Sequence, residues 1–232
     1  MVRAAFFDLD KTILDTSSNV ALSGPFIEAG LMNRRTALTS VLVQLPYLLA
    51  GADESRMEQM AQALGRMGRG WNAAFLEATV EDALERTIQP VCYAQALARI
   101  EAHKRVGDVV VIASASVEQV VRPIAQMLGA DEVLASRAAV DDDGCFTGEI
   151  THFNQAQGRA DAGEALARAR GWDLSECSAY SDSVSDAPLL RLVGHPYAVN
   201  PDRALREMAQ REGWPTLTFT STVRVLPREV PT

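Results

Sequence analysis

The sequence predicts an α/β fold in which a mostly parallel sheet carries helices on both faces. Two observations lead to this prediction. Short apolar segments are each followed by polar or small residues and then by a helical pattern, and this alternation is typical of parallel sheets covered by helices. In contrast, residues 17–86 show almost no strand pattern and read as helices separated by glycines. We therefore expect a helical block inserted directly after the first strand.

The predicted strands are short and rich in apolar residues. Core strands are expected at residues 4–7, 109–113, 178–180 and 197–199, and a further strand at 216–219. Residues 133–139 and 145–150 flank the Asp-Asp-Asp-Gly run at 141–144, and Asp-Gly between β-prone runs indicates a hairpin. Helices are expected at 90–104, from Val117, at 157–170, and around Pro188, which suits a first helical turn.

The composition limits the classes of function. The chain has 232 residues, which favours one large domain or one domain with an insertion. Its net charge of −8 gives no reason to expect nucleic acid or an anionic membrane as a partner. The three cysteines form neither a disulfide pattern nor a zinc pattern, so we expect a cytoplasmic protein. No signal peptide precedes the first strand, and the apolar run at 37–52 is shorter than the roughly 20 residues of a membrane span, so no stable membrane insertion is expected.

Two carboxylates follow the first strand. Asp8 and Asp10 are spaced i, i+2, so both side chains should point to the same side at the carboxyl end of the strand. Open α/β sheets bind their ligands at this end. Like charges held close together are costly unless they share a metal or a proton, which favours a chemical site. Capping of a turn or of the next helix is the alternative interpretation.

Three further segments lie past a predicted strand or at the start of a helix. Ser114 follows the strand at 109–113, where a hydroxyl suits an oxyanion or a phosphate, whereas Ser116 fits a helix cap. Asp182 follows the strand at 178–180 and suits a hard cation, and Asp186 stands four residues later. Arg159 opens the helix at 157–170, where it would neutralise a bound phosphate or, alternatively, lie solvated on the helix surface.

Taken in order, these motifs resemble those of the haloacid dehalogenase (HAD) superfamily. The matching residues are the Asp8–Thr12 run, Ser114, Arg159, and the pair Asp182 and Asp186. The phosphoserine-phosphatase-like branch, subfamily IB, is the most similar, because its members also carry helices inserted after the first motif. The resemblance covers nearly the whole core.

The resemblance implies an architecture. It consists of a Rossmann-like three-layer core with a mostly parallel sheet, and a small α-helical cap domain inserted after the first strand. Residues 1–16 and 88–232 would form the core, and residues 17–87 the cap. Hinges for cap movement are expected near residues 15–18 and 86–90.

The resemblance also implies a chemistry. The chain would be a Mg²⁺-dependent phosphatase that hydrolyses a small phosphorylated metabolite, a phosphomonoester, through an aspartyl-phosphate. Asp8 would be the nucleophile and Asp10 the general acid and base. Mg²⁺ would be held by Asp8, Asp182 and the backbone carbonyl of Asp10. The remaining residues would support these groups: Ser114, Arg159 and Thr12 at the phosphate, and Asp186 behind the metal waters.

Two positions depart from the branch. Arg159 stands where the family usually has a lysine, and it keeps the charge on a bulkier, planar group. Ser17 stands where true phosphoserine phosphatases carry a glutamate for the amino group of the substrate, which argues against phosphoserine. Two other functions stay open: a phosphotransferase that uses the same phosphoenzyme, and a catalytically weak protein that binds phosphate esters.

Overall fold

The computed structural model describes residues 3–33, 59, 62–63 and 65–223. Within these residues, seven strands form one sheet in the order β4-β3-β2-β1-β5-β6-β7. Neighbouring strands are parallel, except that β3 and β4 are antiparallel. The strands are β1 (Ala4–Asp8), β2 (Val109–Val117), β3 (Glu132–Val140), β4 (Phe146–His152), β5 (Ser178–Ser181), β6 (His195–Val199) and β7 (Thr216–Leu217).

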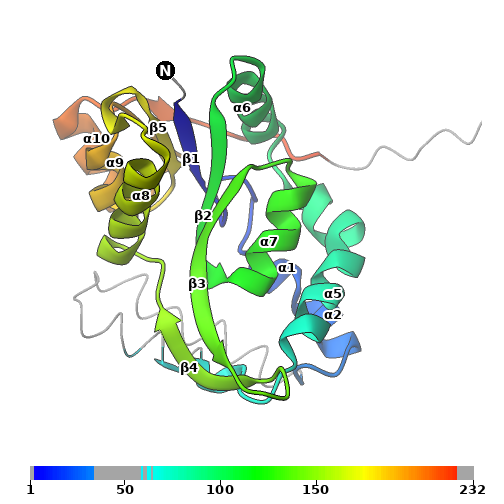
Figure 1. The fold of residues 1–232 in the computed structure, drawn as a ribbon. Helices are drawn as coiled ribbons and strands as arrows, with labels where there is room; N and C mark the ends of the chain where they lie inside the picture. Colours follow the sequence, from blue (N-terminus) through cyan, green and yellow to red (C-terminus); the bar gives the residue numbers. More distant parts are fainter. Residues whose placement is uncertain (1–2, 34–58, 60–61, 64, 224–232) are drawn as a thin grey trace, which may run out of the picture.

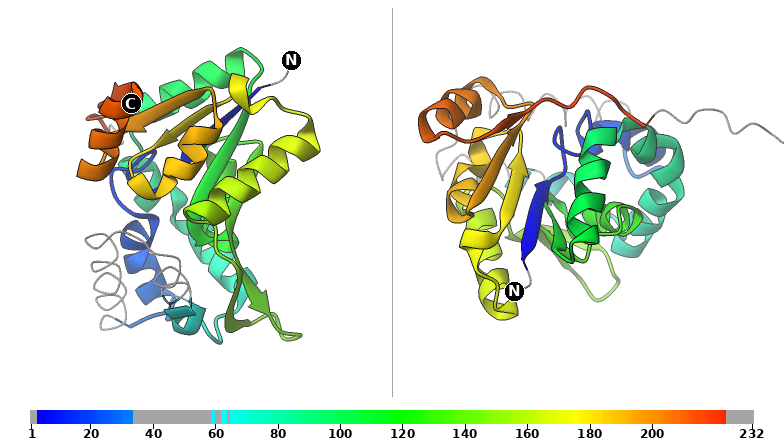
Figure 2. Two further views of the ribbon diagram at one scale, coloured as in Figure 1. Left: turned by 90° about the vertical axis from the view of Figure 1, so that its left-hand side faces the viewer. Right: turned by 90° about the horizontal axis from the view of Figure 1, so that it is seen from above.

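Helices cover both faces of the sheet (Figures 1 and 2). One face carries α8 (Gln157–Arg170), α9 (Ala187–Leu192) and α10 (Arg203–Glu212), and the other carries α6 (Ala94–Arg105) and α7 (Glu118–Met127). The predicted insertion contributes α1 (Ser18–Ala21), α2 (Ser23–Glu28) and α5 (Ala73–Ala83). Shorter helical turns are the π-helix at Leu84–Ile88 and the 3-10 helices at Gln89–Val91, Leu174–Glu176 and Val184–Asp186. The predicted α/β class with a mostly parallel sheet is confirmed.

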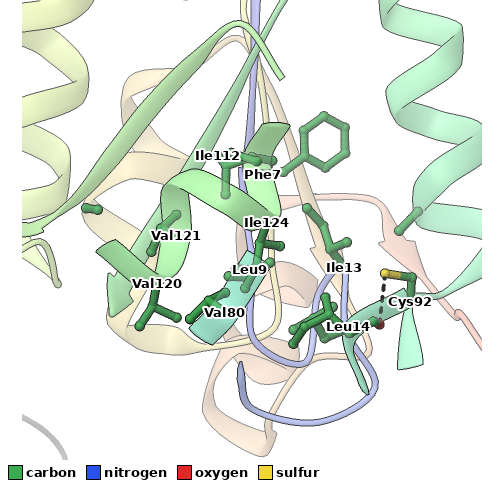
Figure 3. Close-up of a cluster of buried hydrophobic side chains, with 14 of the residues drawn as sticks. Phe7, Leu9, Ile13, Leu14, Val80, Cys92, Ile112, Val120, Val121 and Ile124 are labelled. Carbon is green, nitrogen blue, oxygen red and sulfur yellow. Dashed lines mark hydrogen bonds between the residues drawn. The ribbon is translucent and has the colours of Figure 1, made fainter. Parts of the chain in front are cut away.

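The central strand β1 shows why the sequence pattern identifies the core. Every residue of β1 is buried, because it lies between β2 and β5 with helices on both faces. Alternate side chains enter opposite layers, so Phe7 packs in the cluster beneath α6 and α7, and Phe6 packs in the cluster beneath α8 to α10. Figure 3 shows Phe7 beside Ile112 and Ile124 in the first cluster. A strand buried on both faces reads as a continuous apolar run.

The strand β2 is longer than the sequence predicts. The apolar run ends at Ala113, but the strand continues through Ser114 to Val117, with a shift of its register against β3. The Ser136 hydroxyl donates to the Ala115 carbonyl over 2.7 Å and holds this extension. The predicted hairpin is confirmed as β3 and β4, and the strand predicted at 216–219 is shortened to β7.

Backbone hydrogen bonds tie the end of the insertion to the hairpin. The Gly70 amide donates to the Phe146 carbonyl over 2.8 Å, and the Phe146 amide donates to the Trp71 carbonyl over 2.9 Å. The Ala73 amide donates to the Gly144 carbonyl over 2.9 Å. In addition, α5 packs against the core helix α7 (Figure 1). This part of the insertion is therefore docked on the core.

The beginning of the insertion is described only in part. The apolar run at 37–52 lies outside the described residues, so the boundaries at 16/17 and 87/88 stay predictions. Across the described ranges, no helix combines the length and the apolar character needed to cross a membrane. The π-helix at Leu84–Ile88 and the 3-10 helix at Gln89–Val91 coincide with the second predicted hinge.

Replacing Gly194 with alanine should destabilise the protein strongly. A Cβ atom at Gly194 would lie 1.7 Å from the Ser175 carbonyl oxygen, so the turn before β6 would have to shift. We expect Gly194→Ala to lower the free energy of unfolding, measured in urea, by at least about 2 kcal/mol. Gly24→Ala is the matched control, because nothing lies within 4 Å of a Cβ atom there. An equal loss in both variants would contradict the packing argument.

Candidate active site

The register of the sheet brings the predicted site residues to one edge. Asp8 ends β1 and pairs with Ala113 of β2, so Ser114 begins the extension of β2 next to it. On the other side of β1, Phe7 pairs with Tyr180 of β5, and Asp182 directly follows β5. Because these strands are parallel, their carboxyl ends meet at the same edge of the sheet.

The Arg159 guanidinium is the centre of a buried charge network. Its Nη1 donates to Asp8 Oδ1 over 2.7 Å and to Asp186 Oδ2 over 2.6 Å. The Arg159 side chain is only 4% exposed, so these charges meet where little water has access. The Ser181 hydroxyl also donates to Asp186 Oδ2, over 2.5 Å. Arg159 thus points into the site and is not a solvated surface residue.

Asp8 is held through both of its carboxylate oxygens. Oδ1 accepts from Arg159, and Oδ2 accepts from the Thr12 hydroxyl over 3.2 Å. Thr12 is itself fully buried, so it braces the loop after β1. These two contacts orient Asp8 at the end of the central strand.

Asp10 is held by a residue that the sequence did not single out. The Ser18 amide, in the first turn of α1, donates to Asp10 Oδ1 over 2.7 Å. The Ser18 hydroxyl lies 3.2 Å from the Ser116 hydroxyl, which joins the start of the insertion to the end of β2. The signal in the sequence was the Ser17-Ser18 pair, in which Ser17 is the N-cap of α1. Ser17, where the resemblance leads us to expect the glutamate of a phosphoserine phosphatase, therefore caps a helix.

Burial raises the pKa of Asp8, Asp10 and Asp182. For Asp8, burial raises the pKa well above its ordinary value, against the attraction of Arg159. For Asp10, burial raises the pKa while the hydrogen bonds from Ser18 lower it. Burial and the neighbouring Asp186 raise the pKa of Asp182 to about 7. Burial acts to lower the pKa of Arg159, but Asp186 and Asp8 raise it, so Arg159 stays charged.

The donor set fits a small divalent cation. One oxygen of Asp186, Oδ1, is buried without a hydrogen-bond partner, and no described residue donates to the Asp182 carboxylate. Carboxylate oxygens are the ligands that Mg²⁺ prefers. In the described part of the chain, no three His, Cys, Asp or Glu side chains form a ready metal cage. Mg²⁺ needs less than this, because it keeps several waters and usually takes one or two carboxylates.

Asn154 is a second residue that the sequence did not single out. Its side-chain amide is buried and donates to the Ser114 carbonyl over 3.0 Å and to the Leu134 carbonyl over 2.8 Å. The backbone carbonyl of Asn154 accepts a hydrogen bond from Arg159 Nε over 3.3 Å. Asn154 thus connects β2 and β3 to the arginine of the site. In contrast, the Ser114 hydroxyl makes a local contact, accepting from the Ser116 amide over 3.2 Å.

The turn that carries Arg159 requires a glycine. A Cβ atom at Gly158 would lie 2.6 Å from the Phe153 carbonyl oxygen, so a side chain there would push the turn open. Two residues earlier, Ala156 has a φ of 49°, in the left-handed region. Together these features direct Arg159 from the first turn of α8 towards Asp8.

Two surface hollows lie away from this site. A hollow of about 490 Å³ lies at the amino ends of β2 and β3, and another of about 450 Å³ lies at the amino end of β6. Charged residues that line them are already paired, such as Arg170 with Glu132 and Arg191 with Glu212. The cluster of Asp8, Asp10 and Asp182 lies at the carboxyl ends of the strands, away from both hollows.

A comparison of the sequence with known protein families identifies the family of this chain. The haloacid dehalogenase-like hydrolase family matches residues 5–191, which include every site residue named above. The chain belongs to this family. The predicted family and the predicted hydrolase class are thereby confirmed.

Similar proteins from bacteria support this assignment. The "inhibition of morphological differentiation protein" of Streptomyces azureus is 47% identical over 97% of this chain and 81% of that protein. A probable phosphatase of Mycobacterium tuberculosis is 45% identical over 97% of this chain and 78% of that protein. A phosphoserine phosphatase of M. tuberculosis is 31% identical over 94% of this chain and 71% of that protein.

Solved structures share the fold. A protein from Bordetella pertussis has a TM-score of 0.81 and 28% sequence identity, over 94% of this chain and 98% of that one. A phosphoserine phosphatase, solved as an analogue of its phospho-aspartyl intermediate, has a TM-score of 0.68 and 19% identity, over 96% of both chains. The predicted likeness to the phosphoserine-phosphatase-like branch is confirmed at the level of the fold.

Asn154→Ala should destabilise the protein more than the loss of a surface asparagine. The change leaves the Ser114 and Leu134 carbonyls buried without their donor, so we expect a loss of about 2–4 kcal/mol in the free energy of unfolding. Urea denaturation measures this loss. Asn72→Ala, which removes the N-cap of α5, is the control and should cost about 1 kcal/mol. Similar losses in the two variants would refute the central role of Asn154.

Asp182→Asn should stabilise the metal-free protein at high pH. The pKa of Asp182 is about 7 in the folded protein against an ordinary 3.8, so wild-type stability falls as the pH rises from about 4 through about 7. We expect Asp182→Asn to raise the free energy of unfolding in chelator at pH 8, with a smaller change at pH 4. The exposed Asp173, whose pKa is lowered by Ser175, gives the control Asp173→Asn, which should show no gain at pH 8. Identical behaviour of the two variants would contradict this account of Asp182.

Proposed function

We propose that this protein is a Mg²⁺-dependent phosphatase that hydrolyses a small-molecule phosphomonoester through an aspartyl-phosphate on Asp8. The observation that carries the proposal is the arrangement around Asp8. Arg159 and Thr12 orient this carboxylate, and the protonatable Asp10 stands two residues away. A held nucleophile beside an acid with a raised pKa suits a covalent, two-step hydrolysis.

In the first step, a carboxylate oxygen of Asp8 attacks the phosphorus atom. The bond between phosphorus and the leaving oxygen breaks, and Asp10 gives its proton to that oxygen, so that an alcohol departs. Arg159 opposes the effect of burial and favours the ionised form of Asp8. The raised pKa of Asp10 suits a group that must arrive protonated.

In the second step, water attacks the phosphorus atom of the aspartyl-phosphate. The Asp10 carboxylate left by the first step accepts a proton from this water. The bond between Asp8 and phosphorus breaks, which restores the Asp8 carboxylate and releases inorganic phosphate. Asp10 therefore serves first as acid and then as base.

Asp8, Asp182 and the backbone carbonyl of Asp10 would hold the Mg²⁺ ion, with Asp186 behind its waters. When bound, the ion reduces the repulsion between an anionic nucleophile and an anionic phosphate. The surplus of buried carboxylates over buried cations at this edge supports such an ion. Ser114 and Arg159 would contact the phosphoryl group.

The insertion would contribute to the choice of substrate. We propose residues 17–87 as the cap, because its first helix α1 already reaches Asp10 through Ser18. A probable phosphatase, a phosphoserine phosphatase and, at 28% identity, a histidinol-phosphatase of Neisseria meningitidis among the similar proteins support a small phosphorylated metabolite as substrate. Ser17, as a helix cap, argues against phosphoserine itself. The free Cys92, Cys145 and Cys177 support a cytoplasmic location.

Phosphate release from a panel of phosphorylated metabolites tests the proposal. We expect Asp8→Asn to abolish turnover and chelator to do the same in the wild type. Asp10→Asn should lower kcat by roughly 10²–10⁴-fold, the usual contribution of a general acid and base. The exposed Asp173→Asn is the control and should behave as the wild type. A wild-type rate in the Asp8→Asn protein would exclude the aspartyl-phosphate.

A further inference from the structure

Lys11 occupies an unusual backbone position beside the site. It directly follows Asp10 and has a φ of 60°, in the left-handed region where glycine is the favoured residue. The Lys11 amide donates to the Thr16 carbonyl over 3.2 Å, so this conformation is part of a closed loop. A side chain kept in a strained conformation at a site indicates a functional use.

The Lys11 side chain is exposed and free to meet a ligand. Among the described residues, none forms a hydrogen bond or an ion pair with its ammonium group. The only other lysine of the chain, Lys104, donates instead to the Gly129 carbonyl over 2.9 Å. Arg159 is buried and already shared between Asp8 and Asp186. Among the described residues, Lys11 is therefore a cation that follows Asp10 directly and has no partner.

The charge of Lys11 acts on the site. Lys11 begins the loop that leads from Asp10 to Ser18, whose amide returns to Asp10 Oδ1 over 2.7 Å, and its charge lowers the pKa of both Asp10 and Asp182. Asp202, which also influences Asp182, is occupied by the amides of Val184 and Leu205. Without Lys11, the carboxylates would repel a second negative charge on a substrate.

We propose that Lys11 binds an anionic group on the leaving group of the substrate, so that the preferred substrate is a phosphomonoester that also carries a carboxylate or a second phosphate. This inference rests on the proposed function, because a leaving oxygen that takes its proton from Asp10 places the leaving group beside the next residue, Lys11. A charged hydrogen bond there adds to the binding of an anionic leaving group and adds nothing for a neutral one.

A matched pair of esters tests the proposal. 3-Phosphoglycerate and glycerol 3-phosphate both carry a primary phosphate and differ in a carboxylate against a hydroxymethyl group. We expect the wild type to have the higher kcat/KM on 3-phosphoglycerate. Lys11→Gln should lower the ratio of kcat/KM on 3-phosphoglycerate to kcat/KM on glycerol 3-phosphate roughly tenfold, as expected for the loss of a charged hydrogen bond. Lys11→Arg keeps the charge and should keep most of this preference. Lys104→Gln, at the other lysine, should leave the ratio unchanged.

A glycine variant separates binding from folding. Lys11→Gly removes the charge and suits the left-handed backbone, so it should lower the ratio as Lys11→Gln does without lowering the free energy of unfolding. If the wild type does not distinguish the two esters, or if the Lys11 variants lower both kcat/KM values equally, the proposal is overturned. An equal loss would mean that Lys11 only supports the carboxylates.

A binding measurement keeps this proposal distinct from the proposed function. Dimethylation of the lysines with ¹³C-formaldehyde keeps their charge and gives one NMR signal for each lysine. In the Asp8→Asn protein, 3-phosphoglycerate should shift the Lys11 signal more than glycerol 3-phosphate does, while the Lys104 signal stays in place. If this shift occurs but no ester is hydrolysed by the wild type, the phosphatase proposal fails and Lys11 remains an anion-binding residue. If esters are hydrolysed and the Lys11 signal does not shift, the present proposal fails alone.

Discussion

The site depends on one buried cation placed between two carboxylates. Arg159 neutralises Asp8 and Asp186 at distances of 2.7 and 2.6 Å, and none of the three side chains is more than 10% exposed. Removing one partner of such a buried pair leaves the other charge uncompensated, which is strongly unfavourable. The tight turn at Gly158, the backbone carbonyl of Asn154 and the start of α8 all serve to keep the guanidinium in this place. The fold around Asp8 can thus be understood as support for one ion-pair network.

Arg159 stands where the resemblance to the family leads us to expect a lysine, and the structure shows what the larger guanidinium group contacts. A single nitrogen, Nη1, contacts both acids, while Nε contacts the Asn154 carbonyl. An ammonium group has no second, fixed nitrogen for such a backbone contact. Arg159 therefore ties the acids to the segment before α8 as well as neutralising them.

The sequence was sufficient to predict the positions of residues that directly follow strands. It was insufficient to predict the residues that contact them from distant parts of the chain. Asp8 and Asp182 were predictable because a buried parallel strand is a continuous apolar run and its carboxyl end is where ligands bind. Ser18 and Asn154 were not, because each acts through contacts with residues distant in sequence: Ser18 with Ser116, and Asn154 with Ser114. The extension of β2 to Val117 was not predicted for a similar reason. Ser136 and the pairing with β3 hold this extension, which has no apolar pattern of its own.

The contact between Ser18 and Asp10 couples the position of α1 to a proton. The Ser18 amide donates a hydrogen bond that Asp10 Oδ1 accepts. A carboxylate oxygen accepts more strongly when it is ionised, so the contact favours the ionised form of Asp10 and lowers its pKa. Thermodynamic linkage makes this relation reciprocal: the loss of the proton from Asp10 strengthens its hold on the first turn of the insertion. Ionised Asp10 therefore holds the first turn of α1 more firmly than protonated Asp10 does, and the strength of this contact depends on pH.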